Sequence, residues 1–229
     1  MKKLLLCAAA IAVAISAGAW TPATETTPQL GTPHNAKQAP AGLLVKRAEA
    51  KAHRAGAKKK VNAPASVASD LMGGYTWTCN VAQDLNEATQ STEKNNVVIY
   101  DADDNTGTFK IAGMFDAPVT ARFEAGSGGW LPIFSSESTF TIDQDQAVVY
   151  TSKYGKCKVM GLFYYEGDEE YPADWYYTDI DGTVNDDGTL SFDEEVWFYR
   201  VILEGEFADY YLTPVWMPGS AMAPNSEVN

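Results

Sequence analysis

The chain has 229 residues, of which 45% are hydrophobic and 21% are charged, and its net charge is −13. The charge divides sharply along the chain. Residues 20–60 hold eight Lys or Arg and two acids, a net of +6, whereas residues 61–229 hold seven Lys or Arg and 28 acids, a net of −21. An acidic body of this kind repels polyphosphates, so nucleic acid is excluded as an expected partner.

The first nineteen residues are typical of a secretory signal peptide. Lys2 and Lys3 precede an apolar run at 4–15, and small residues at 16–19 fit a cleavage site. A run this short does not cross a ~30 Å hydrocarbon core as a permanent helix, and no second long run follows it. Cys7 lies near the start of the run rather than at its end, which disfavours a lipid anchor. We therefore expect an exported protein without an integral membrane segment, located in the periplasm, at the cell surface or outside the cell.

The basic segment at 20–69 is rich in Ala and Pro and has little apolar surface to bury. This composition predicts a largely disordered linker. Leu43, Leu44 and Val45, together with the alanines, allow one or two turns of helix. Attachment to an anionic envelope surface and docking on the protein's own acidic face are the alternatives.

From Leu71 onward the sequence alternates between large apolar and small polar residues, which is the period of a strand with one buried face. A short helix at 81–88 is the one helical segment expected in this part. The predicted strands lie at 75–81, 96–101, 108–114, 119–124, 129–134, 147–151, 157–165, 176–180, 189–192 and 196–203, separated by Asp-, Asn- and Gly-rich turns. Many short strands predict an all-β fold, an antiparallel β-barrel or a β-sandwich. The strand at 196–203 is apolar in both phases, which favours the barrel.

The segments at 70–77, 109–114, 129–133 and 187–192 resemble those of uncharacterised secreted β-barrel proteins that are similar to calycins, the class that includes lipocalins. Tyr75 stands two residues after Gly73, where the lipocalin opening motif has its Trp, and Trp77 follows two residues later. The resemblance covers most of 70–212 and implies a barrel in an exported protein, without catalytic residues. The predicted organisation is a signal peptide at 1–19, the linker at 20–69, the barrel domain at 70–215 and a disordered tail at 216–229.

The chain carries few of the groups that catalysis requires. Its two histidines, His34 and His53, both precede residue 61, so the predicted barrel offers neither a Ser-His-Asp site nor an imidazole metal site. No phosphate loop or dinucleotide fingerprint occurs, and we expect no cofactor.

A glycosidase needs two facing carboxylates. Candidates are plentiful, but no particular pair stands out among Glu166, Asp168, Glu169, Glu170, Glu194 and Glu195.

Asp101, Asp103 and Asn105 alternate as the ligands of a calcium loop do, which makes them the candidate metal site. Thr106 stands where the EF-hand requires Gly, and this favours a hairpin turn in which Gly107 has a positive φ.

Cys79 and Cys157 each fall in the apolar phase of a predicted strand. In an oxidising compartment they form a disulfide if their Cα atoms lie within ~7 Å of each other. Otherwise they are buried, inert small hydrophobes.

Aromatic residues crowd the last third of the chain, interleaved with acids. In adjacent pairs on a strand, one ring faces inward and its neighbour faces outward. Outward rings beside carboxylates suit a sugar or a peptide, although they also pair across strands without any ligand. The candidate ligand-binding residues are Tyr164, Trp175, Tyr177, Trp197 and Tyr199.

The sequence therefore predicts an exported, non-enzymatic β-barrel that binds a small apolar molecule or a glycan. The alternatives are a carboxylate-dependent glycan hydrolase or lyase, and a structural or adhesin-like surface module.

Overall fold

The structure is a computed structural model that describes residues 29–33, 36–55, 66–84, 87–126, 137–149 and 154–225. The predicted signal peptide, the predicted strand at 129–134 and the basic run at 58–60 lie outside the described residues.

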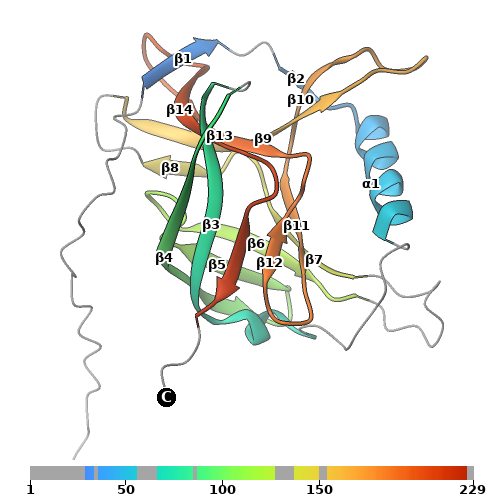
Figure 1. The fold of residues 1–229 in the computed structure, drawn as a ribbon, viewed down its shortest axis with the longest axis vertical. Coiled ribbons are helices and arrows are strands. Elements are labelled where there is room, and N and C mark those ends of the chain that lie inside the picture. Colours follow the sequence, from blue (N-terminus) through green and yellow to red (C-terminus); the bar gives the residue numbers. More distant parts are fainter. Residues whose placement is uncertain are drawn as a thin grey trace, which may run out of the picture.

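Eight antiparallel strands close into a β-barrel, which confirms the predicted all-β barrel (Figure 1). Around the ring they are β3 (Gly73–Asp84), β4 (Glu87–Asp103), β5 (Thr108–Ala112), β6 (Val119–Glu124), β7 (Ser138–Ile142), β11 (Ile180–Val184), β12 (Leu190–Phe192) and β15 (Ala221–Pro224). β15 pairs back onto β3, from Ala221 opposite Thr78 to Pro224 opposite Tyr75, and this closes the ring. The strands follow the ring in chain order, so the barrel has an up-and-down topology.

The alternation in sequence becomes alternation in burial. On β3, Tyr75, Trp77 and Cys79 are buried while Thr78 and Asn80 are exposed. The helix expected at 81–88 does not form, because β3 continues to Asp84 and β4 begins at Glu87. Pairing between distant strands outweighs a weak local helical preference in this segment.

The sheet is continuous beyond the barrel and branches at β3, where Val81 and Ala82 pair with β14 instead of β15, and we call this branch the second sheet. Outward from β3, its strands are β14 (Tyr210–Trp216), β13 (Trp197–Ile202), β9 (Lys156–Tyr165), β10 (Asp174–Thr178) and β2 (Lys37–Gln38). β1 (Gln29–Pro33) adds to β14, and β8 (Ala147–Val149) adds to β9. Five strands of the second sheet therefore come from two excursions of the barrel meander, β8–β10 between β7 and β11 and β13–β14 between β12 and β15, while β1 and β2 come from the segment before β3.

β13 is buried on both faces, as its sequence indicated. Phe198 and Ile202 join the same core as the barrel interior, whereas Tyr199 and Val201 belong to a separate cluster on the other face. The strand whose pattern favoured a barrel thus lies outside the ring of eight. β13 is covered on both faces because one face packs on the barrel core and the other face packs in the separate cluster of Tyr199 and Val201.

The barrel interior is packed with side chains. The ring of Trp77 lies 6.0 Å from Phe198 and 6.0 Å from Trp216. Farther along, Phe140 and Phe192 meet edge to face at 5.1 Å. Trp77, Phe140 and Phe198 are fully buried. The described residues thus give this barrel a solid aromatic core, with spacing typical of packed rings.

Helix α1 (Ala41–Ala55) lies within the segment predicted as a linker, and a short 3₁₀ helix, η1 (Ala68–Leu71), precedes β3. Leu43 of α1 is fully buried and packs with Phe163, Tyr176 and Val196 of the body. β15 similarly brings Ala221–Pro224 of the predicted tail into the barrel. Among the described residues, no helix is long and apolar enough to cross a membrane.

Candidate ligand-binding face

The five predicted ligand-binding residues lie on one face of the second sheet. Tyr164 stands opposite Trp175 across β9 and β10, and their rings meet edge to face at 5.4 Å. Tyr177 and Trp197 flank Leu162 from either side. Tyr199 follows Trp197 by two residues and is therefore on the same side of β13. We call these five residues the aromatic face.

Exposure differs across the aromatic face. Tyr164 is 53% exposed, and Trp175, Tyr177 and Trp197 are half-buried. Tyr199 is only 1% exposed and packs edge to face against Tyr211 at 5.7 Å. Burial raises the pKa of Tyr199, with a smaller contribution from Tyr177. Four aromatic rings are thus within reach of a ligand, while Tyr199 belongs to the buried cluster against which Trp175, Tyr177 and Trp197 pack.

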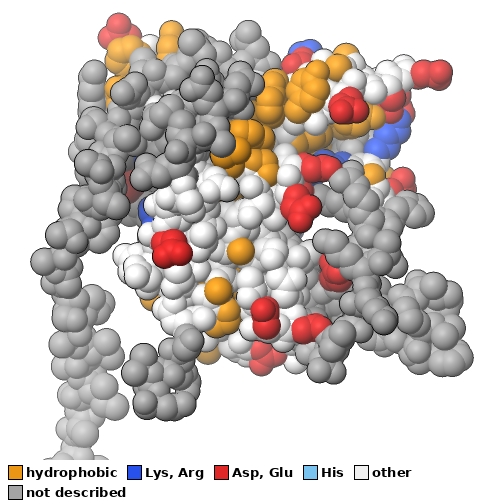
Figure 2. Space-filling view, viewed as in Figure 1, with side chains coloured by type: hydrophobic (Ala, Val, Ile, Leu, Met, Phe, Trp, Pro, Cys, Tyr) orange, Lys and Arg blue, Asp and Glu red, His pale blue; other side chains and the backbone are white. Residues whose placement is uncertain are grey.

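The spacing of the rings follows from the strands that carry them. Trp175 and Tyr177 are two residues apart on β10, which is ~7 Å along a strand. Tyr177 and Trp197 are separated by β9, which places them ~10 Å apart across two strand spacings. Figure 2 shows hydrophobic side chains gathered on the upper part of the visible face, the region of β9, β10 and β13 in Figure 1.

A charged pair lies at the β10 edge of the second sheet, on the face opposite to the aromatic face. Lys37 Nζ lies 2.5 Å from Asp174 Oδ2, next to Trp175, and both side chains are partly exposed. Hydrogen bonding to Asp174 raises the pKa of Lys37. Because side chains alternate between the two faces of a strand, Asp174 and Lys37 share the face of Tyr176, and this pair does not lie beside the rings of the aromatic face.

The candidate calcium residues have protein partners. Asp101 pairs with Lys110 at 2.5 Å, and Asp103 Oδ1 accepts a hydrogen bond from the backbone N–H of Asn105 at 2.9 Å. That hydrogen bond is the main cause of a lowered pKa at Asp103. Gly107 has φ +67°, as the hairpin turn requires. In the part of the chain that the structure describes, no three His, Cys, Asp or Glu residues come together as a metal site, and calcium at this turn stays a prediction.

Cys79 and Cys157 are both free and buried in the core. The disulfide that the sequence left open is therefore not formed in this structure. Burial raises the pKa of Cys79 to about 12 and also raises the pKa of Cys157. Both thiols stay protonated at neutral pH and pack as small apolar groups.

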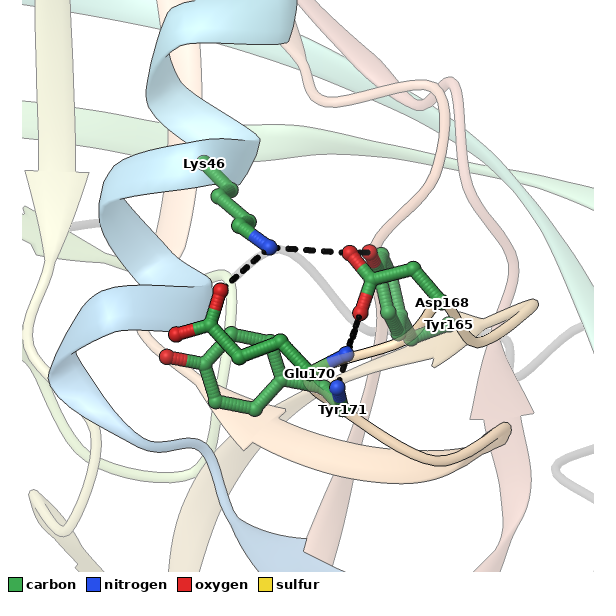
Figure 3. A network of polar contacts seen from close by, with 5 residues as sticks. All are labelled: Lys46, Tyr165, Asp168, Glu170 and Tyr171. Atoms are coloured by element: carbon green, nitrogen blue, oxygen red, sulfur yellow. Dashed lines mark hydrogen bonds and ion pairs between the residues drawn. The ribbon is translucent and has the colours of Figure 1, made fainter.

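Two of the candidate catalytic carboxylates are held by α1 (Figure 3). Lys46 Nζ lies 2.9 Å from Asp168 Oδ2 and 2.6 Å from Glu170 Oε2. The Tyr165 hydroxyl donates to Asp168 Oδ2 at 2.7 Å, and the N–H groups of Glu170 and Tyr171 donate to Asp168 Oδ1. Tyr165 and Lys46 hold the pKa of Asp168 well below its usual range, and Lys46 lowers the pKa of Glu170. Neither residue suits a proton donor, which needs a raised pKa.

A second carboxylate group, which is not among the catalytic candidates predicted from the sequence, surrounds Arg47. Its guanidinium pairs with Asp193 and lies 3.5 Å from Asp181 Oδ2. Beside it is a hollow of about 170 Å³ lined by Leu44, Arg47, Ala48, Thr178, Asp179 and Asp181. Burial raises the pKa of Asp179, and Asp143 and Asp181 add to this effect. These residues come from α1, β10, β11 and turns that are far apart in the sequence, so no local motif brings them together.

No known protein family, curated protein or solved structure matches this chain.

Proposed function

We propose that the protein is an exported, non-enzymatic binding protein that holds a glycan on its aromatic face. The observation that carries this proposal is the row of Tyr164, Trp175, Tyr177 and Trp197, partly exposed on one face of the second sheet. Flat aromatic rings bury the apolar face of a sugar, which is the contact that this row offers.

A small apolar molecule is the second ligand class that this face fits. Such ligands usually bury 70–90% of their surface in pockets of roughly 300–1,000 Å³. The barrel interior is instead occupied by Trp77, Phe140 and Phe198, all fully buried. An open aromatic row therefore favours the glycan.

The up-and-down closure of eight strands supports the resemblance to calycins, which we retain as a proposal together with export.

The test measures binding through tryptophan fluorescence and affinity electrophoresis, with a panel of soluble glycans and a panel of apolar molecules. We expect a saturable response to a glycan that falls at least tenfold in affinity in Trp175→Ala and Trp197→Ala. Tyr100→Ala, which removes another partly exposed ring on β4, is the matched control and should bind as the parent does. No response to either panel, or equal loss in the control, would refute the proposal.

A glycan hydrolase centred on Asp179 and Asp181 is the rival function. It is favoured by two neighbouring carboxylates of which Asp179 has a raised pKa, the pattern of an acid and base pair. The hollow beside them, about 170 Å³, is smaller than ordinary ligand pockets, which disfavours it. Turnover of a bound glycan that is abolished by Asp179→Asn would establish the hydrolase and remove the binding-only proposal.

A further inference from the structure

Helix α1 covers a defined surface of the body, at the side of the molecule in Figure 1. The floor of this surface is Phe163, Tyr176 and Val196, on which the fully buried Leu43 packs. Phe163 and Tyr176 are stacked at 5.9 Å on the face of β9 and β10 opposite to the aromatic face. Its rim is acidic: Asp168, Glu170, Asp181 and Asp193. We call these seven residues the helix-docking surface.

The fully buried residue of α1 and the two cations that form its ion pairs lie on one side of one helical turn. Leu43, Lys46 and Arg47 stand at positions i, i+3 and i+4, which share a helix face. Lys46 pairs with Asp168 and Glu170, and Arg47 pairs with Asp193 while its guanidinium lies 4.9 Å from the ring centre of Phe163. The Arg47 and Asp193 side chains are only 8% and 7% exposed. The surface thus selects an apolar residue followed by two adjacent cations one turn later.

We propose that the helix-docking surface is a recognition site for a basic amphipathic helix of a partner protein, and that α1 is its intramolecular occupant. Charge complementarity argues for this partner, since the acidic rim faces a helix from a segment of net charge +6 on a body of net charge −21. A 15-residue helix is marginal by itself in water, so α1 depends on docking for much of its order. A partner helix that reproduces Leu43, Lys46 and Arg47 displaces α1 and takes its place.

Competition sets the expected size of the effect. A tethered segment acts at an effective concentration of the order of 1 mM. If α1 itself binds the vacant surface with a Kd of about 10 µM, a competing partner helix is therefore weakened roughly hundredfold while α1 is docked. The proposal predicts that releasing α1 increases affinity for an added helix, whereas no gain is expected if α1 is an integral part of the body and the surface does not persist without it.

The test titrates the full chain with a fluorescent peptide of residues 36–55. Arg47→Glu sets a carboxylate against Asp181 and Asp193 and releases α1, so this variant should bind the peptide at least tenfold more tightly than the parent. Val45→Glu is the matched control, because Val45 is 56% exposed on α1, and it should bind as weakly as the parent. Binding should weaken between 0.1 and 1 M NaCl, since charge pairs are screened.

Two further arms keep the proposal open to refutation. Adding Asp193→Arg to Arg47→Glu restores opposite charges within the chain and should return peptide binding to the weak parental level. Leu43→Asp provides a second release variant if Arg47→Glu does not fold, as judged by circular dichroism. Equal peptide affinity in parent and release variants, or equal binding of a scrambled peptide, overturns the proposal. Light scattering gives the mass of the parent protein in solution. A dimer in which the two copies exchange α1 also overturns the proposal, because the occupant of the surface is then a second copy of this chain.

Discussion

Trp77 allows a direct test of the packed barrel. It is fully buried, and its ring lies 6.0 Å from Phe198, 6.0 Å from Trp216 and 6.2 Å from Phe115. Truncating a buried Trp to Ala costs about 3–5 kcal/mol, from lost burial and from the cavity left behind. The indole Nε1 has no hydrogen-bond partner among the described residues. An unpaired buried donor destabilises the folded state, so removing it offsets part of the stability that the truncation costs. We therefore expect Trp77→Ala to lose about 3 kcal/mol.

The assay is urea unfolding followed by circular dichroism, together with a thermal melt. A chain of this size loses about 2–4 °C of Tm per kcal/mol, so the melt should fall by about 6–12 °C. Trp175→Ala is the matched control, because it removes a half-buried ring whose cross-strand pairing with Tyr164 contributes only about 0.2–1 kcal/mol. Equal losses in the two variants, or a loss below 1 kcal/mol in Trp77→Ala, would refute the packed-core interpretation.

Three other predictions concern single sites. Asp179 has a raised pKa because it is buried, so its contribution to stability is full below the unfolded pKa of ~3.9 and declines as pH rises through the folded pKa. Asp179→Asn keeps an acceptor for the Gln144 N–H and should stabilise the protein at pH 7 but not at pH 3. A lower free energy of unfolding in urea at pH 7 would contradict this expectation. Cys79 and Cys157 should resist a thiol reagent at pH 8 in the folded protein and react within minutes in 6 M guanidinium, and fast labelling of the folded protein would show that the thiols are accessible. At Gly161 an added Cβ would lie 2.5 Å from the Thr178 carbonyl oxygen, so Gly161→Ala should destabilise the fold by about 1–3 kcal/mol in urea, and unchanged stability would mean that β10 can shift freely.

Much of the strand content was predictable from local pattern. Side chains on a strand alternate between faces, so the order Trp175, Tyr176, Tyr177 already places the first and third rings together. The structure shows Trp175 and Tyr177 on the outer face and Tyr176 on the inner one. The pattern could not reveal that Tyr199 is buried, because its cover depends on Tyr211 of the separate strand β14.

The sequence alone determined the periodicity of the strands and the lack of histidine after residue 53. It also determined the division into a basic segment at 20–60 and an acidic body at 61–229. These properties depend on composition and on spacing between near neighbours. The tertiary structure decided that β15 returns to close the barrel on β3, that two excursions supply most of the second sheet, and that Arg47 reaches Asp193 146 residues away. These features depend on contacts between segments that are far apart in the sequence. The contributions of such contacts to stability arise only in the folded chain, so local sequence patterns do not reveal them.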